Sequence, residues 1–114
     1  MVGIDVVAVG RIKTAIENPK FVERVFTQKE YTYYKIRNKA ETLAGIYAAK
    51  EAFMKAFGKG VDIGVFHEIE VNHTESGAPI FNLTGRAKEL ADGKNVFLSI
   101  SHDGGVAVAA VSVE

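Results

Sequence analysis

Residues 40–57 read AETLAGIYAAKEAFMKAF, and they form the strongest helix prediction in the chain. The stretch is rich in alanine and free of proline, so intrinsic propensity favours a helix along its whole length. Gly58 and Gly60 come after it, and glycine is typical of the residues that end a helix. We therefore expect one long helix here, against which a sheet packs.

Strand patterns lie on both sides of this helix. Residues 2–9, VGIDVVAV, are mostly β-branched, which predicts a buried strand ended by Gly10. Polar and apolar residues alternate in HEIEVNH at 67–73, as in a half-exposed strand, and IFNL at 80–83 follows the turn ESGAP. NVFLSIS at 95–101 and VAVAAVSV at 106–113 are joined by HDGG, which predicts a closing hairpin with a Gly-rich turn.

Short helices are expected elsewhere. Asn18-Pro19 separates two short helical pieces, and proline suits the first position of a helix. Residues 27–30, TQKE, form a capping-box pattern, and Thr84 can cap a helix that runs to about Ala91. The element order therefore predicts an α+β fold, a mostly antiparallel sheet packed on one long helix plus short helices, in a single domain over residues 1–114.

Composition excludes several classes of protein. The chain has 114 residues, of which 47% are hydrophobic, and it contains no cysteine, so disulfides and thiolate zinc sites are excluded. No apolar run is long enough to span a membrane, and the N-terminus lacks a signal-peptide pattern, so we expect no membrane association and a cytoplasmic location. A net charge of zero argues against nucleic-acid binding.

The charges are nevertheless unevenly distributed. Residues 10–39 hold eight Lys and Arg side chains against three Glu. This basic segment suits an acidic partner.

Asp5 is the first candidate for chemistry, because it interrupts an apolar strand and must find a cation, hydrogen-bond donors or a proton. Glu51 and Lys55 are four residues apart on one face of the long helix. The simplest interpretation of Asp5 is a structural carboxylate that accepts hydrogen bonds from backbone donors or from an arginine. The simplest interpretation of Glu51 and Lys55 is a surface ion pair. The alternative is a Mg²⁺ site, because Mg²⁺ takes one or two protein carboxylates when substrate phosphates supply further ligands.

Histidines and glycine turns give weaker signals. His102 is expected just past the end of a strand, beside Gly104 and Gly105, and such a histidine is usually solvated. His67 and His73 show no metal-ligand spacing, so both are interpreted as surface residues.

A series of motifs occurs in order along the whole chain: GID at 3–5, Arg11, F-x-x-R-x-F-T-x-x-E at 21–30, A-A-K-E-A-x-x-K-A at 48–56, G-x-P at 77–79 and S-I-S-H at 99–102. Together they resemble the holo-acyl-carrier-protein synthase family, the small phosphopantetheinyl transferases of fatty-acid synthesis. The resemblance implies the 4'-phosphopantetheinyl transferase fold. It also implies Mg²⁺-dependent transfer of 4'-phosphopantetheine from coenzyme A to a serine of apo acyl carrier protein, which releases adenosine 3',5'-bisphosphate.

The resemblance also assigns roles to residues. Asp5 and Glu51 would bind Mg²⁺, and Lys55 would contact the pyrophosphate, so these three are the expected catalytic residues. His102 and the turn from Gly77 to Pro79 would hold the nucleotide end of coenzyme A.

Two further expectations concern binding partners. The acidic carrier protein would dock on the basic side chains Arg11, Lys13 and Arg24. The family further implies a homotrimer with active sites at the subunit interfaces.

One departure from the family stands out. Ile46 occupies the place of a family arginine that pairs with the 3'-phosphate of coenzyme A. The cofactor-binding role is expected to pass to Lys39, with Arg37 and Lys50 as alternatives. Two other functions stay open, a Mg²⁺-dependent phosphoryl or pyrophosphate hydrolase and a non-enzymatic trimeric module.

Overall fold

The computed structural model describes residues 1–59 and 63–114, so Gly60, expected to help end the long helix, lies outside the described residues. The elements, in chain order, are β1 (Val2–Ala8), α1 (Val9–Ala15), α2 (Pro19–Val25), α3 (Gln28–Arg37), α4 (Ala40–Ala56), the 3₁₀ helix η1 (Ile63–Glu68), β2 (Ile69–His73), β3 (Pro79–Leu83), α5 (Gly85–Leu90), β4 (Val96–Asp103) and β5 (Val106–Val113). This arrangement confirms the α+β class.

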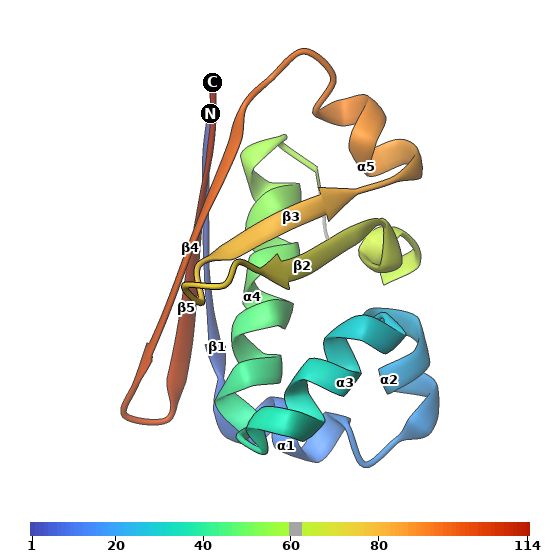
Figure 1. Cartoon of the computed structure of the whole chain (residues 1–114), viewed down its shortest axis with the longest axis vertical. Coiled ribbons are helices and arrows are strands. Elements are labelled where there is room, and N and C mark those ends of the chain that lie inside the picture. Colours follow the sequence, from blue (N-terminus) through green and yellow to red (C-terminus); the bar gives the residue numbers. More distant parts are fainter. Residues whose placement is uncertain (60–62) are drawn as a thin grey trace.

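The strands form two antiparallel sheets rather than one. The first has the order β1-β5-β4, and the second is the hairpin of β2 and β3. Figure 1 shows the three-stranded sheet edge-on along one side of α4, with the β2–β3 hairpin crossing α4 on another side. Helices α1 to α3 gather at one end of α4 and α5 lies near the other.

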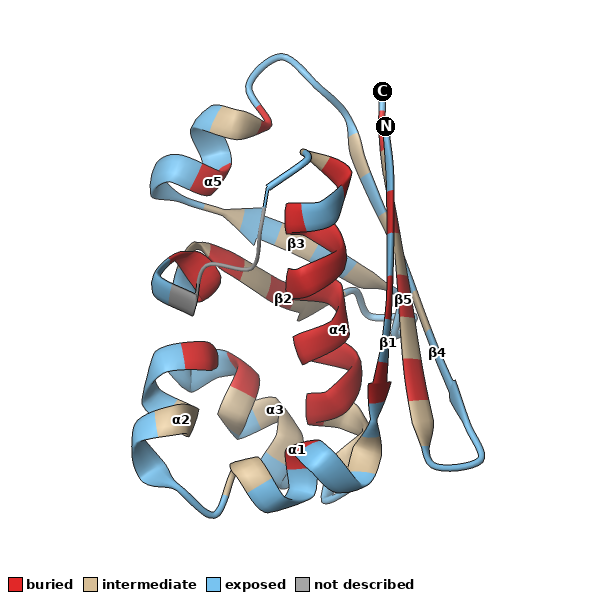
Figure 2. Ribbon diagram, turned by 180° about the vertical axis from the view of Figure 1, so that it is seen from behind, coloured by how far each residue is buried: buried red, intermediate tan, exposed pale blue. Residues whose placement is uncertain are grey.

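Helix α4 is the centre of the core. It begins at Ala40 and ends at Ala56, which confirms the predicted long helix, and Gly58 adopts the left-handed φ of +68° after it. Figure 2 shows α4 buried along most of its length. Its alanines let neighbouring elements approach closely on several sides, which explains why an alanine-rich sequence can fill a core.

Two glycines set how closely α4 approaches the three-stranded sheet. A Cβ added to Gly3 would lie 2.0 Å from the Ala52 carbonyl oxygen and 2.6 Å from the Ala56 nitrogen, so only glycine allows β1 to lie against the helix backbone here. A Cβ on Gly45 would lie 2.8 Å from Cγ2 of Ile100 on β4. The site residues lie on these closely packed elements.

A buried ion pair ties α4 to its other neighbours. Lys50 Nζ lies 2.8 Å from Glu30 Oε1, and both side chains are fully buried. The ammonium also donates to the carbonyl oxygens of Phe66 and Ile69, at 2.8 and 3.0 Å. Glu30 Oε2 in turn accepts the backbone N–H of Val71 at 2.7 Å. All the hydrogens of the ammonium therefore have acceptors, and α3, α4, η1 and β2 are held at one point.

Most local predictions are confirmed. Pro19 is the first residue of α2 after an Asn18 cap, and both hydrogen bonds of the capping box of Thr27 and Glu30 are present at α3. Thr84 precedes α5, but its side chain makes no cap hydrogen bond.

Other local predictions are wrong. Gly10 lies inside α1 and does not end the first strand, because the helix starts directly at Val9. The strand β2 begins only at Ile69, since the two residues before it belong to the unpredicted 3₁₀ helix η1.

Candidate functional site

Asp5, Glu51 and Lys55 meet where β1 crosses α4. Asp5 lies on the buried face of β1, two residues after Gly3, and its side chain is 7% exposed. Lys55 Nζ lies 2.8 Å from Asp5 Oδ1 and 3.3 Å from the carbonyl oxygen of Ile4, while its side chain remains half exposed. The surface pair between Glu51 and Lys55 is therefore not what forms: Lys55 pairs with Asp5, and Glu51 is buried.

The two carboxyls lie close enough to affect each other's ionisation. Burial, and then the neighbouring Asp5 carboxyl, raise the pKa of Glu51 to about 7 from the ordinary 4.5. The second oxygen of Asp5, Oδ2, is buried and has no hydrogen-bond partner within the described residues. A buried acceptor without a partner is costly, so a cation or a proton is expected at this point.

These donors fit Mg²⁺. Both are hard carboxylate oxygens from different elements, one of them is unpartnered, and Mg²⁺ uses one or two protein carboxylates where phosphate oxygens complete the shell. Across residues 1–59 and 63–114, no group of three or more His, Asp or Glu side chains is arranged to hold a metal ion. Asp5 and Glu51 would therefore have to share any Mg²⁺ with a substrate.

Tyr47 and Arg11 extend this site toward α1. The pKa of Tyr47 is raised to about 12 by burial and then by the Glu51 carboxyl, so the phenol stays protonated and donates to Glu51. Arg11 Cζ lies 5.6 Å from the centroid of the Tyr47 ring, in a cation–π contact. Arg11, expected to bind a partner, therefore also borders the carboxylate pair.

A cleft of about 170 Å³ lies on the opposite flank of α4, between α3, the β2–β3 turn and β4. We call it the α3–α4 cleft; its lining includes Tyr33, Arg37, His73, Gly77, Pro79 and His102. Three predicted cofactor-binding residues, Gly77, Pro79 and His102, thus come together. His102 is exposed, but it lies within β4 opposite Ala107 rather than past the strand end, because the hairpin turn is only Gly104-Gly105.

The carboxylate pair and the α3–α4 cleft are separate in one chain. Asp5, Glu51 and Lys55 do not line the cleft. β1, which carries Asp5, and β4, which carries His102, are the two edge strands of the sheet, with β5 between them. Neighbouring strands lie about 4.8 Å apart, so the two edges are roughly 10 Å apart.

The three side chains that could replace the family arginine lie in different parts of the structure. Lys50 is fully buried in its pair with Glu30 and cannot reach a ligand, so that alternative is wrong. Lys39 is exposed and does not line the α3–α4 cleft, whereas Arg37 does. Ile46 is 2% exposed and packs in the core. An apolar packing residue therefore stands at the position of the family arginine.

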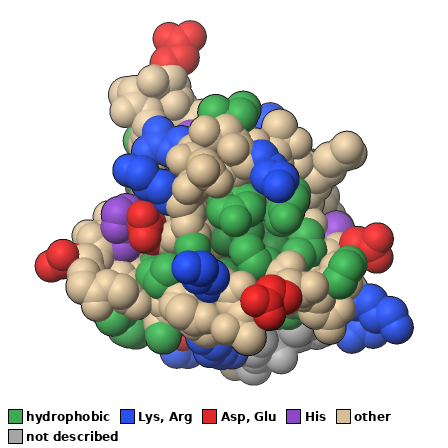
Figure 3. All heavy atoms as spheres, turned by 90° about the horizontal axis from the view of Figure 1, so that it is seen from below, with side chains coloured by type: hydrophobic (Ala, Val, Ile, Leu, Met, Phe, Trp, Pro, Cys, Tyr) green, Lys and Arg blue, Asp and Glu red, His purple; other side chains and the backbone are tan. Residues whose placement is uncertain are grey.

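The remaining basic side chains lie at one end of the molecule. Lys13 is on α1 and Arg24 on α2, and both are exposed. Seen from the end that carries α1 to α3, Lys and Arg side chains lie around a central hydrophobic patch, with some acidic side chains among them (Figure 3).

Comparison with known proteins assigns the chain and its fold to a family. The family model described as the 4'-phosphopantetheinyl transferase superfamily matches residues 1–111. The chain belongs to this superfamily. It is 44% identical over 117 residues to the holo-[acyl-carrier-protein] synthase of Clostridium botulinum (strain Eklund 17B / Type B), covering 99% of this chain and 95% of that protein. It is 46% identical over 106 residues to that of Thermoanaerobacter sp. (strain X514), covering 89% and 77%.

Solved structures of the same transferase type agree. The Helicobacter pylori holo-[acyl-carrier-protein] synthase in complex with coenzyme A superposes with a TM-score of 0.88 at 32% identity, covering all of both chains. The Bacillus anthracis holo-(acyl-carrier-protein) synthase in complex with CoA (3',5'-ADP) gives 0.80 at 37% identity, covering 98% of this chain and 92% of that one. The resemblance of the motifs to this family is thereby confirmed.

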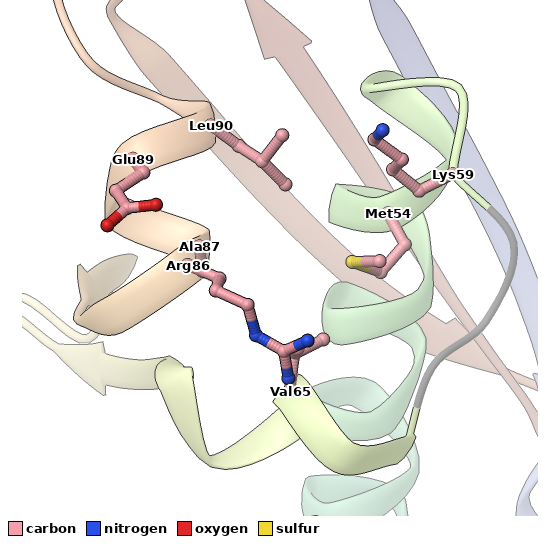
Figure 4. Close-up of a pocket in the computed structure, with 7 residues that line it drawn as sticks. All are labelled: Met54, Lys59, Val65, Arg86, Ala87, Glu89 and Leu90. Carbon is pink, nitrogen blue, oxygen red and sulfur yellow. The ribbon is translucent and has the colours of Figure 1, made fainter.

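The transferase also has a larger cavity, of about 440 Å³, that contains none of the predicted site residues. It lies between α5, the end of α4 and η1, where Met54 and Leu90 face it together with Lys59 and Arg86 (Figure 4). Size alone therefore does not locate the chemistry of this transferase.

Sequence reasoning missed one pair of rings. His73, interpreted as a surface residue, stacks on Tyr33 with ring centroids 4.0 Å apart and an interplanar angle of 6°. Both rings line the α3–α4 cleft. Nothing in the local sequence marks this pair, because Tyr33 is on α3 and His73 ends β2.

Finally, none of the described helices is both long and apolar enough to pass through a membrane.

Proposed function

We propose that this chain is a holo-[acyl-carrier-protein] synthase, which transfers the 4'-phosphopantetheine group of coenzyme A to a serine of apo acyl carrier protein in fatty acid biosynthesis. The observation that carries the proposal is the buried Asp5 carboxyl, which has one unpartnered oxygen, interacts with Glu51 and pairs with the half-exposed Lys55 through its other oxygen. Membership of the superfamily and the named relatives support the same reaction.

Mg²⁺ held by Asp5 and Glu51 would neutralise negative charge on the pyrophosphate of coenzyme A. Lys55 is fixed by Asp5 on one side and open to solvent on the other, so its ammonium can contact the pyrophosphate oxygens. In the transfer, the serine oxygen bonds to the phosphorus that carries pantetheine, and the bridging P–O bond breaks. Adenosine 3',5'-bisphosphate leaves with the bond electrons, and the serine proton passes to a base.

Tyr47 and Lys55 hold the two carboxyls in place for this reaction. The Tyr47 phenol donates to Glu51, and Lys55 donates to one oxygen of Asp5. Each carboxyl is thus oriented by a donor while Oδ2 of Asp5 stays available. Such support fixes acidic ligands more precisely than a solvated loop would.

A second copy of the chain is part of the proposal. Within one copy the carboxylate pair and the α3–α4 cleft lie at opposite edges of the sheet, so we assign the two ends of coenzyme A to the pair of one copy and the cleft of a neighbour, in a homotrimer with active sites at the interfaces. The outer face of β1 supports this, because Val2, Ile4 and Val6 are 66%, 55% and 60% exposed. Three apolar side chains in a row on an uncovered strand favour burial against another chain.

The basic end of the molecule is the proposed docking surface for acyl carrier protein. Arg11, Lys13 and Arg24 offer positive charge there, and Arg11 also borders the carboxylate pair through Tyr47. Docking at this end would bring the serine of the partner to the site of transfer. We place the reaction in the cytoplasm.

The test is intact-mass analysis of apo acyl carrier protein incubated with this protein, coenzyme A and Mg²⁺. A gain of one phosphopantetheine is expected with the wild type and with Asp92→Asn, an exposed aspartate away from the site, and not with Asp5→Asn. Release of bisphosphate without carrier protein would indicate a hydrolase instead. A protein that binds neither Mg²⁺ nor coenzyme A would be a non-enzymatic module.

A further inference from the structure

Tyr47 connects the carboxylate pair to the basic end of the molecule. It lies on α4, against which α1 packs (Figure 1), and the residue is only 4% exposed. Its ring packs against Phe21 of α2 and Phe66 of η1, with centroid distances of 6.0 and 5.7 Å. Because two further elements enclose the ring, the directions of its hydroxyl and of its faces are fixed.

The hydroxyl of Tyr47 acts on the metal side. It donates to Glu51, which lies one turn further along α4. Glu51 forms no ion pair within residues 1–59 and 63–114, and the Asp5 carboxyl beside it is a group of like charge. A phenol is a neutral donor, so it orients this carboxylate without cancelling the charge that attracts Mg²⁺.

The face of the same ring acts on the docking side. Arg11 Cζ lies 5.6 Å from the ring centroid. Arg11 is exposed, and neither ion pair of the described chain includes it. A cation over an aromatic face is attracted to the ring but keeps its charge. The guanidinium is therefore held against α4 while it remains available to an acidic partner.

A direct ion pair between Arg11 and Glu51 would defeat both purposes. It would neutralise the cation that a carrier protein needs and the carboxylate that Mg²⁺ needs. Tyr47 holds the two groups near one another through different parts of its side chain, and both charges are kept.

We propose that Tyr47 is a positioning residue with two separable roles: its hydroxyl orients Glu51 for Mg²⁺, and its ring orients Arg11 for the carrier protein. One buried side chain then sets the metal and the docked serine relative to each other. The inference rests on the proposed function, since it explains how that site and that docking surface are kept in register. Phenylalanine keeps the ring and lacks the hydroxyl, so the two roles can be tested apart.

The first test is titration calorimetry of Mg²⁺ into protein saturated with coenzyme A. Tyr47→Phe should weaken Mg²⁺ binding by about 10- to 100-fold, the range for losing an outer hydrogen bond to a metal ligand. In steady-state kinetics at saturating Mg²⁺, its KM for carrier protein should stay within about twofold of the wild-type value, because the ring still lies beneath Arg11.

The second test removes the ring. Tyr47→Leu should lose the same Mg²⁺ affinity and also raise KM for carrier protein by about 2- to 5-fold, the range for an exposed cation–π contact. Arg11→Ala should raise this KM as well. Combined with Tyr47→Leu, the two effects should be less than additive, because both variants remove one contact. Combined with Tyr47→Phe, Arg11→Ala should give the KM of Arg11→Ala alone.

The matched control is Tyr31→Phe. Tyr31 also carries a cation over its ring, with Lys35 Nζ 5.7 Å from the centroid, but its ring packs on Tyr34 of the same helix. Loss of its hydroxyl should change neither Mg²⁺ affinity nor KM for carrier protein. The proposal is overturned if Tyr47→Phe binds Mg²⁺ as the wild type does, or if it raises KM for carrier protein as much as Tyr47→Leu.

Calorimetry also separates this inference from the reaction itself. If the wild type binds Mg²⁺ but modifies no carrier protein, and Tyr47→Phe weakens that binding, the proposed function is wrong while the role of Tyr47 toward Glu51 stands. If the wild type modifies carrier protein and Tyr47→Phe keeps full Mg²⁺ affinity, the function stands and the role of Tyr47 is refuted. A wild type that binds no Mg²⁺ refutes the role together with the metal site.

Discussion

Replacing Lys50 with Met should strongly destabilise the protein, because it breaks the buried pair with Glu30. Methionine has a similar shape and no charge, so the packing around α4 is largely kept. The loss is electrostatic: Glu30 remains fully buried without its cation, and the carbonyl oxygens of Phe66 and Ile69 lose the donor that lies 2.8 and 3.0 Å away.

The size of the effect follows from the burial. Removing one partner of a buried ion pair costs about 3–5 kcal/mol, because the other charge is left uncompensated. For a chain of 114 residues each kcal/mol lowers the melting temperature by about 4 °C, so a decrease of about 12–20 °C is expected. Glu30 keeps the N–H groups of Thr27 and Val71, which favours the lower part of this range.

The loss should depend on pH in a known direction. Burial raises the pKa of Glu30 even with Lys50 present, and loss of the ammonium raises it further. The folded variant then holds a proton that the unfolded chain has released, so its free energy of unfolding falls as the pH rises above the ordinary pKa of 4.5. The variant should therefore be less destabilised at pH 5 than at pH 8.

The assay is urea unfolding of the wild type, Lys50→Met and Lys50→Met/Glu30→Gln at both pH values. The double variant should recover part of the loss at pH 8, because no buried charge remains. Lys88→Met, an exposed lysine of α5, is the control and should change the unfolding free energy by less than about 0.5 kcal/mol. A loss below about 1 kcal/mol for Lys50→Met at pH 8 would refute the reasoning, since it would mean that the carboxylate reaches water.

Four further predictions concern the site. Asp5→Ala and Glu51→Gln should each abolish transfer while the melting temperature stays the same or rises, because a buried carboxylate is removed; near wild-type transfer by either would contradict the metal assignment. Gly3→Ala should lower the unfolding free energy by about 1–3 kcal/mol and weaken Mg²⁺ binding in calorimetry, since its Cβ would lie 2.0 Å from the Ala52 oxygen and push β1 away from α4. Arg11→Glu should raise KM for carrier protein more than KM for coenzyme A, and steady-state kinetics showing equal effects would instead place Arg11 with the carboxylate pair. Without Mg²⁺ the melting temperature should fall between pH 5 and pH 8, because Glu51, with a pKa of about 7, keeps a proton only in the folded state; a slope unchanged in Glu51→Gln would contradict this.

Local patterns in the sequence determined most of the elements. The long helix, the capping box of Thr27 and Glu30, and the closing hairpin depend on spacings of three, four or two residues, which are visible in a short window. The failures are local too: a glycine after an apolar run predicts that the strand ends at Gly10, yet β1 passes directly into α1, which contains Gly10. The motifs also placed the chain in its superfamily, because their order along the whole chain is specific.

Tertiary structure alone decided which side chains meet. Lys55 was expected beside Glu51 by helical spacing, but its ion pair is with Asp5, fifty residues earlier, because Gly3 lets β1 lie directly against α4. The same holds for Lys50, whose position on an alanine-rich helix does not show that Glu30 and two carbonyl oxygens surround it. These contacts depend on how closely distant segments pack, and that distance is set by the fold as a whole rather than by any short stretch of sequence.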